Sequence, residues 1–189
     1  MGTEREDYLD RVLIGGREPV QITVMDYDPT WPARFQDRAA VVRRALGPRA
    51  GLVEHIGSTA VPGLAAKPII DMLLTVADVG DEPAYLPPLG SVGFVLRVRE
   101  AEHRMLRTPG RDVHLHVYEP DRPEVRDYLY LRYWLRVDAD DRSRYTGTKR
   151  RLAERQWTDM SDDADAKTEV VLDILARARA WRARRPESP

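Results

Sequence analysis

The chain has 189 residues, 42% of them hydrophobic and 32% charged, which is typical of a single soluble globular domain with a sizeable core. Its 30 basic and 31 acidic side chains give a net charge of −1, so the overall charge gives no reason to expect nucleic acid or an anionic membrane as a partner. The absence of cysteine excludes disulfides, thiolate metal sites and a cysteine nucleophile, which leaves imidazole and carboxylate groups as metal ligands.

The N-terminal segment predicts a short amphipathic helix. Apolar residues at helical spacing run from 4 to 14, and Gly15-Gly16 ends the pattern. We treat residues 1–19 as an extension that packs on the surface or on a partner, or is held loosely, and residues 20–189 as a single domain. No signal-peptide pattern opens the chain and no apolar run reaches the roughly 18 residues of a membrane span, so we expect a cytoplasmic protein.

The next segment predicts a strand and then a helix. Residues 21–24 have the pattern of an edge strand. Thr30 is a suitable N-cap with Pro32 just inside the helix, and Gly47-Pro48 ends it. One face of this helix is apolar and is expected to cover one side of a sheet; it is formed by Trp31, Phe35, Ala39, Val42 and Leu46.

The central stretch HIGSTAVPGLAAKPIID begins at His55 and contains a turn with suitable chemistry for a phosphate. Gly57 can adopt backbone angles that are closed to other residues and lets a ligand approach the main chain. Ser58 and Thr59 add hydroxyls beside successive backbone N–H groups. Strands are predicted on both sides of this turn, at residues 52–53 and 69–76.

Beyond this stretch, the pattern predicts further strands and then a helical C-terminal third. Residues 78–88 have the composition of a loop, with a short helix over 85–90. Strands are predicted at 94–98, 103–108 and 113–118. Helices are predicted from a capping-type start at Asp121–Glu124 through Arg136, over about 141–156, and after Asp162-Asp163.

Asp71 and the histidines form a candidate metal centre. Asp71 lies in an otherwise apolar strand, where its carboxylate needs a cation, a metal or a hydrogen-bond donor. Because side chains alternate along a strand, His114 and His116 share one face. Imidazole with carboxylate suits Mn²⁺ or Zn²⁺ better than Mg²⁺. The structural alternative is that an imidazolium or Lys67 pairs with the carboxylate. The four histidines, all in or beside predicted strands, are His55, His103, His114 and His116.

The central stretch, together with Tyr27-Asp28-Pro29, Trp31-Pro32 and His114-Leu115-His116-Val117, resembles the GrpB family of nucleotidyltransferase-fold proteins. From about Val24 to the last helix, the resemblance implies an α+β fold, with a nucleotidyltransferase-like mixed β-sheet, flanking helices and a helical C-terminal third. The family carries basic residues at positions that correspond to Arg104, Arg132, Lys149 and Lys167.

Active nucleotidyltransferases of this fold present two carboxylates two residues apart on one strand, with a third acid on a neighbouring strand. This chain keeps Asp71, has Leu73 at the second position and offers no strand acid at the third. Tyr133 also replaces an aspartate of the family pattern. The candidate functions are a metal-dependent nucleotidyltransferase acting on an unknown small acceptor, an inactive module that binds a nucleotide or phosphate ligand, and a His/Asp transition-metal enzyme of another class.

The resemblance and the residue chemistry together give one set of candidate site residues. The ligand is expected to be a small molecule such as an NTP, without nucleic acid or membrane, and the cofactor a divalent metal, Mg²⁺ or Mn²⁺ with Zn²⁺ as an alternative. The catalytic set is Asp71, Lys149 and Lys167; the phosphate-binding set is Gly57, Ser58, Thr59, Lys67, Arg104 and Arg132; the metal set is Asp71, His114 and His116.

Overall fold

A mixed five-stranded sheet forms the centre of the computed structural model, which describes residues 2–157 and 159–184. The strand order is β2-β3-β6-β5-β4, with β3 and β6 parallel and the other neighbours antiparallel. The strand predictions around this sheet are confirmed to within two residues at most ends. The strands are β2 (Val53–Ile56), β3 (Ile70–Thr75), β4 (Val95–Arg99), β5 (Arg104–Arg107) and β6 (Val113–Tyr118).

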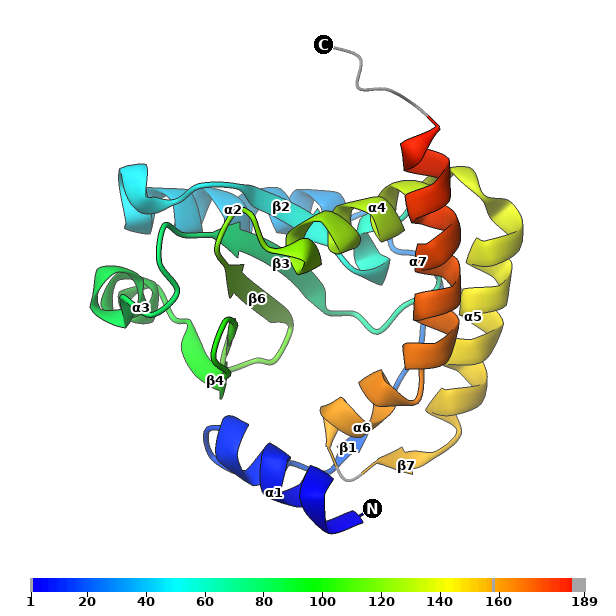
Figure 1. Cartoon of the computed structure of the whole chain (residues 1–189), viewed down its shortest axis with the longest axis horizontal. Helices are drawn as coiled ribbons and strands as arrows, with labels where there is room; N and C mark the ends of the chain where they lie inside the picture. The colour runs from blue at the N-terminus through cyan, green and yellow to red at the C-terminus, as the bar shows by residue number, and fades with distance from the viewer. Residues whose placement is uncertain (1, 158, 185–189) are drawn as a thin grey trace.

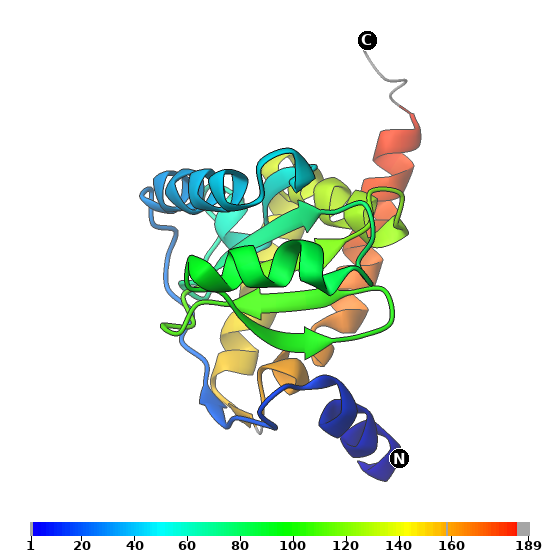
Figure 2. The same ribbon diagram turned by 90° about the vertical axis from the view of Figure 1, so that its left-hand side faces the viewer.

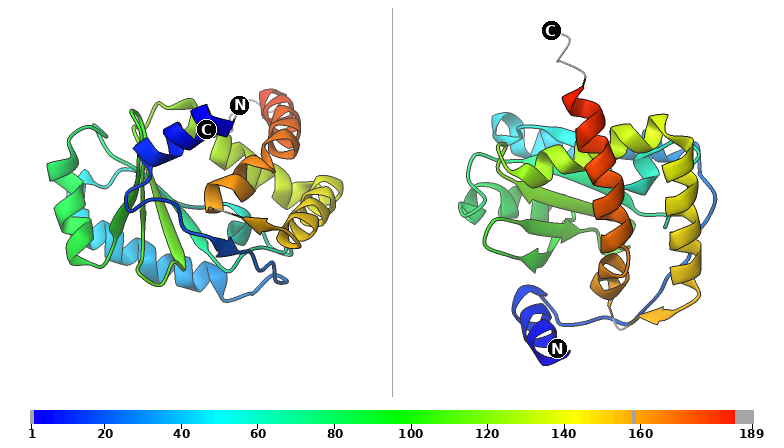
Figure 3. Two further views of the ribbon diagram at one scale, coloured as in Figure 1. Left: turned by 90° about the horizontal axis from the view of Figure 1, so that it is seen from below. Right: turned by 45° about the vertical axis from the view of Figure 1, so that its right-hand side comes forward.

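Helices α2 (Trp31–Leu46) and α3 (Glu82–Ser91) cover one face of the sheet, as Figure 3 (left) shows, and the short helix η1 (Gly47–Arg49) follows α2. The predicted apolar face of α2 is buried and packs on alternate side chains of the strands. This layer contains the main hydrophobic core, because strand alternation sends Val113, Leu115 and Val117 toward α2. The same alternation leaves His114 and His116 on the opposite face of the sheet.

The C-terminal helices stand on that opposite side (Figures 1 and 3). Helix α4 packs on the sheet through Val125, which contacts a small cluster around Ile56 and Leu73. None of the helices in the described part of the chain combines the length and the apolar composition that crossing a membrane requires. The elements of this third are α4 (Pro123–Val137), α5 (Ala139–Ala153), β7 (Gln156–Trp157), α6 (Met160–Asp165) and α7 (Thr168–Ala183).

Several predicted boundaries are corrected by the structure. Residues 21–24 do not form an edge strand of the main sheet, because β1 (Val20–Gln21) pairs with β7 in a separate two-stranded sheet. Much of the loop predicted over 78–88 belongs to α3, which tolerates Pro83 in its first turn. Helix α4 starts at Pro123 without a side-chain cap, whereas α5 is capped by Asp138, which accepts a hydrogen bond from the Asp141 N–H.

The N-terminal segment, which consists of α1 (Gly2–Val12) and the residues up to 20, is packed against the sheet and the C-terminal third. Figure 2 shows it running beneath the sheet from the edge near β4 toward the C-terminal helices. Leu9 and Leu13 are buried, and Leu13 forms a β-bridge with Val98. Arg5 pairs with Asp162 of α6, so the start of the segment is held as well.

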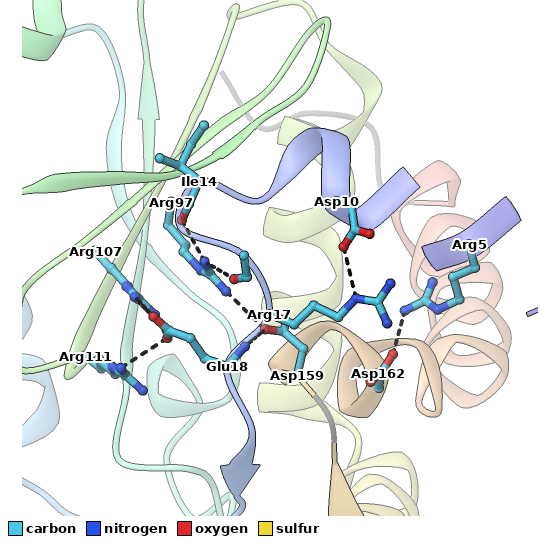
Figure 4. Close-up of polar contacts among 11 residues, drawn as sticks. Arg5, Asp10, Ile14, Arg17, Glu18, Arg97, Arg107, Arg111, Asp159 and Asp162 are labelled. Carbon is cyan, nitrogen blue, oxygen red and sulfur yellow. Dashed lines mark hydrogen bonds and ion pairs between the residues drawn. The ribbon is translucent and has the colours of Figure 1, made fainter. Parts of the chain in front are cut away.

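A buried ion pair fixes this segment (Figure 4). The Arg97 guanidinium donates to the Asp159 carboxylate at 3.0 Å, and both residues are at least 95% buried. The same guanidinium donates to the carbonyl oxygens of Ile14 and Gly16 at 2.7 and 2.6 Å. The Glu18 N–H donates to Asp159 at 3.0 Å. One arginine therefore ties β4, the N-terminal segment and the start of α6 together.

We predict that Arg97→Met releases the N-terminal segment while the sheet stays folded. Breaking a buried ion pair costs about 3–5 kcal/mol, which corresponds to roughly two to four orders of magnitude in local protection. Hydrogen exchange should therefore become that much faster over residues 9–16 only. The matched control is Arg99→Met, because Arg99 is half-exposed and its pair with Glu82 does not involve this segment. Unchanged exchange in the Arg97 variant would contradict the prediction.

Candidate functional site

A cavity of about 550 Å³ lies on the face of the sheet opposite α2. Its walls come from three parts of the chain that are far apart in sequence: the β2-to-β3 turn with β3, β5 and β6, the helices α4 to α7, and the N-terminal segment. Tyr8, Leu9 and Val12 give the N-terminal wall an apolar and aromatic character. Ser58, Lys149 and Lys167 lie together in another part of the lining, at the turn between β2 and β3 and at α5 and α7.

Asp71, His114 and His116 come together in this cavity. The parallel register places Asp71 directly beside His114 on the neighbouring strand. The Asp71 Oδ1 atom lies 3.5 Å from His114 Nδ1 and 4.0 Å from His116 Nε2. One ligand atom from each residue lies within 4.8 Å of the other two, which is compact enough for a divalent cation after a small adjustment.

Burial and neighbouring groups shift the pKa values of Asp71 and His116. Burial alone raises the pKa of Asp71, but the hydrogen bond to His114 and the nearby His114, His116 and Lys67 outweigh it and lower this pKa. Burial, followed by the neighbouring His103, lowers the pKa of His116 to about 3. An ionised carboxylate therefore faces a neutral imidazole, which are the protonation states that a metal ligand set needs.

Gly57 is required by its contact with Asp71. Its φ of +69° lies in the region that favours glycine, and a Cβ atom there would stand 2.4 Å from the Asp71 Oδ2 atom. The short helix η2 (Ser58–Ala60) follows immediately. The glycine therefore makes room for the carboxylate, a role different from the ligand approach that the sequence indicated.

Lys149 reaches the same turn from α5. Its Nζ atom donates to Ser58 Oγ at 2.9 Å and to the Ala65 carbonyl, and it lies 4.5 Å from the centroid of the Tyr145 ring. Lys149 is 5% exposed. Burial, and then the positive charges of Lys167 and Lys67, lower its pKa to about 7. The ammonium group is thus held at the edge of deprotonation beside Ser58.

Lys67 and Lys167 meet at one carboxylate. Both ammonium groups donate to the Asp163 Oδ2 atom, and Asp163 is 2% exposed. Burial, and then the charge of Lys67, lower the pKa of Lys167 to about 8. Lys67, Lys149 and Lys167 form a lysine cluster in which Asp163 accepts from Lys67 and Lys167. The three ammonium groups outnumber this carboxylate.

Of the remaining predicted site residues, Arg104 lies elsewhere and Thr59 has a structural role, whereas Arg132 lines the cavity. Arg104 does not belong to the site, because strand alternation turns it with Leu106 toward α3, where it donates to Glu82 at 2.6 Å. The Thr59 hydroxyl donates to the Ile69 carbonyl and has no proton left for a ligand. Arg132 lines the cavity and donates to Glu54 and to the His55 carbonyl, both at 2.6 Å, but its buried Nε atom has no hydrogen-bond partner.

His55 also lies outside the metal group. Its ring stacks on Phe35 of α2 with the centroids 4.8 Å apart, on the far face of the sheet. The structure adds Tyr8, Glu100, His103, Tyr128 and Tyr145 to the cavity. It also places Asp163 behind the cavity wall, as the acceptor for Lys67 and Lys167. Strand alternation in the sequence separates His55 from the other three histidines. The long-range packing of α6 and the N-terminal segment has no comparable local signal.

The low pKa values of the two lysines predict that the cavity binds sulfate with a strong pH dependence. Sulfate stays divalent between pH 6 and 9, whereas Lys149 and Lys167 lose their protons through about pH 7 and 8. Because only the charged forms attract an anion, affinity should be highest below pH 7 and fall about tenfold or more by pH 9, or roughly 1.4 kcal/mol. Calorimetric titration measures this change. In Lys149→Met the decline should begin about one pH unit later, and a flat profile of the unsubstituted protein would contradict the assignment.

Comparison with known proteins places the chain in a family. The profile of the GrpB protein family matches residues 21–177. A UPF0157 protein of Streptomyces coelicolor is 49% identical over 181 residues, which cover 96% of this chain and 97% of that protein. The crystal structure of the conserved protein GrpB from Enterococcus faecalis has a TM-score of 0.73 at 30% identity, covering 84% of this chain and 99% of that one. The GLD-2/RNP-8 complex has a TM-score of 0.51 at 14% identity, over 79% of this chain and 59% of that one, a likeness of fold alone. The chain therefore belongs to the GrpB family and has a nucleotidyltransferase-like fold.

Proposed function

We propose that this protein transfers a nucleotidyl group from an NTP to a small acceptor and depends on a divalent metal. The observation that carries this proposal is that one cavity brings a carboxylate–imidazole group and a cluster of lysines within reach of the same ligand. Nucleotidyl transfer requires positive charge on both sides of the reacting phosphorus, because negative charge builds up on the phosphate oxygens and on the leaving group.

The lysine cluster is the binding site for the terminal phosphates in this proposal. Ser58 and Lys149 are already hydrogen-bonded to each other, and an anion would neutralise the repulsion between Lys149 and Lys167. Arg132 has an unpartnered Nε atom at the same cavity. These contacts would orient the triphosphate with its leaving pyrophosphate toward α5 and α7.

Asp71, His114 and His116 are the residues that would hold the metal. Two imidazoles with one carboxylate fit Mn²⁺ or Zn²⁺ better than Mg²⁺, which prefers an all-oxygen set. When bound, such a cation would draw electron density from the phosphate oxygens. In this proposal, the imidazole nitrogens of His114 and His116 take the place of the missing second strand carboxylate as ligands.

The proposed reaction is a simple displacement at the α-phosphorus. An acceptor hydroxyl oxygen forms a bond to the α-phosphorus. The bond from that phosphorus to the oxygen that bridges the α- and β-phosphates breaks, and pyrophosphate leaves with both bonding electrons. The acceptor proton passes to solvent. The protonated Lys149 and Lys167 stabilise the charge on the departing pyrophosphate.

One observation favours a second function, a binding module without catalysis. Leu73 occupies the second carboxylate position of active nucleotidyltransferases, and it is fully buried in a cluster with Ile56, Tyr118 and Val125. Apolar packing therefore occupies the position where active nucleotidyltransferases carry their second metal-binding acid. A transition-metal enzyme of another class is the third candidate, and His114 and His116 are the residues that favour it.

Asp71→Asn separates these functions. We expect the variant to fold and its affinity for Mn²⁺ or Zn²⁺ to fall by more than the roughly 10–100-fold that is typical of losing an outer-shell contact. Any metal-dependent stabilisation by NTP should disappear as well. Thermal unfolding with ATP, CTP, GTP and UTP, with and without each metal, measures this. Asp112→Asn is the control, since its carboxylate pairs with Thr108 and Arg34 outside the cavity. Stabilisation by NTP without metal identifies the binding module, and bound Zn²⁺ without any nucleotide effect the third function.

Ser58→Ala tests the phosphate contact alone. We expect NTP affinity to fall by about 1–3 kcal/mol, the cost of one lost hydrogen bond to a charged group, while metal binding stays unchanged. Calorimetric titration of NTP and of metal separates the two effects. Ser91→Ala, at a hydroxyl bonded to the Pro88 carbonyl outside the cavity, serves as the control. Equal NTP affinities for both variants would refute the role of Ser58.

A further inference from the structure

Behind His116, away from Asp71, a chain of hydrogen bonds leads to the N-terminal segment. His116 Nδ1 lies 3.1 Å from His103 Nε2, and His103 Nδ1 lies 2.6 Å from a carboxylate oxygen of Glu100. The Tyr8 hydroxyl donates to the other oxygen of that carboxylate. Tyr8, Glu100, His103 and His116 all line the candidate cavity, so the chain runs along its wall.

The two imidazole rings are arranged for an N–H···N hydrogen bond. Their planes differ by 9° and the centroids are 5.3 Å apart, a geometry that accommodates a hydrogen bond between the facing nitrogens at 3.1 Å. The Tyr118 ring stacks on His103 at a centroid distance of 4.5 Å, and the Tyr128 ring lies against His116 at 5.7 Å. These aromatic contacts fix the orientation of both imidazoles.

The acceptor at the end of the chain decides which nitrogen of each ring carries a proton. Hydrogen bonds from His103 and Tyr8 keep the pKa of Glu100 low, so its carboxylate can only accept. A His103 ring with a single proton must carry it on Nδ1, where it donates to Glu100, which leaves a lone pair on Nε2. That lone pair accepts from His116, whose proton must also be on Nδ1. The Nε2 atom of His116 is left with a lone pair that faces Asp71.

We infer that Glu100 and His103 are positioning residues that hold His116 as a preformed ligand for a divalent cation. This inference rests on the metal-dependent function proposed above and adds its supporting residues. A ligating histidine commonly gives its second N–H to a fixed acceptor, which sets the ring orientation and makes the ligating nitrogen more basic. Here the acceptor is another histidine, whose own tautomer is set by a carboxylate.

The chain of hydrogen bonds from Tyr8 to His116 also gives the N-terminal segment a role in the site. Tyr8 lies on α1, and its hydroxyl contact is one of the polar links between that helix and the sheet. Residues outside the region that matches the family profile, which begins at 21, thus contribute to the orientation of His116. The segment completes the support of the centre as well as forming a wall of the cavity.

The tautomers can be measured directly without metal. Long-range ¹H–¹⁵N correlation spectra of the ¹⁵N-labelled protein distinguish protonated from unprotonated imidazole nitrogens, and the single-histidine variants assign the four rings. We expect His103 and His116 each to carry the proton on Nδ1 and a bare Nε2. A proton on the Nε2 atom of His116 would overturn the inference, since that nitrogen would then donate to Asp71 instead of binding a cation.

The effect on metal affinity is tested with His103→Phe, which keeps an aromatic ring against Tyr118 and removes both ring nitrogens. We expect affinity for Zn²⁺ and Mn²⁺ to fall about 10–100-fold in calorimetric titration. Glu102→Gln is the matched control, because Glu102 lies in the same turn but pairs with Arg122, and its affinity should equal that of the unsubstituted protein. Thermal unfolding of the metal-free proteins confirms that each variant is folded.

The outcomes separate this inference from the proposed function. Equal metal affinity of the folded His103→Phe variant and the unsubstituted protein would overturn the positioning role and leave the metal centre intact. If the unsubstituted protein binds neither metal, the proposed metal-dependent function fails, and the positioning of a cation ligand fails with it, even where the spectra show the expected tautomers. Weaker binding in the Phe variant together with both Nδ1 protons supports the inference.

Discussion

A carboxylate in the middle of an apolar strand is the constraint on which the candidate site depends. Asp71 gains its ionised state from the groups around it, since burial alone would favour the neutral acid. Three features meet this demand at once. The parallel register of β6 supplies His114, the next residue on the same face supplies His116, and Gly57 leaves the space that a side chain would otherwise fill. The histidines on β6 and the glycine in the turn therefore both serve to accommodate the ionised carboxylate of Asp71.

The lysine cluster also lines the cavity and places buried positive charges close together, whereas Asp71 is a buried negative charge. Three ammonium groups are gathered around the Ser58 turn and Asp163, and burial lowers the pKa of both Lys149 and Lys167. Such crowding costs free energy in the absence of a ligand. It is a common feature of sites that are arranged for an anion, because the missing negative charge is supplied on binding. The cavity therefore combines an ionised carboxylate at Asp71 with a separate group of lysines beside Ser58.

Much of the sheet could be predicted from sequence, because period-two alternation and turn residues are local signals. The alternation of Val113–Tyr118 even gives the face that His114 and His116 share. The same rule also separates His55 and Arg104 from the site. Each is a direct neighbour, along its strand, of residues that line the cavity, so its side chain lies on the other face of the sheet. Asp163 and Glu100 could not be found in this way. Their roles arise from packing between segments distant in the chain, for which a single sequence carries no direct signal.

The N-terminal segment divides the information for this cavity between two stretches of the chain. Asp71, its histidines and the lysines lie within residues 21–177, whereas the apolar wall with Leu9 and Val12 lies outside them. The wall is attached mainly by Arg97 and its partners, away from the lysine cluster. Substitutions at its apolar positions can therefore reshape the space for a ligand while leaving the charged groups in place.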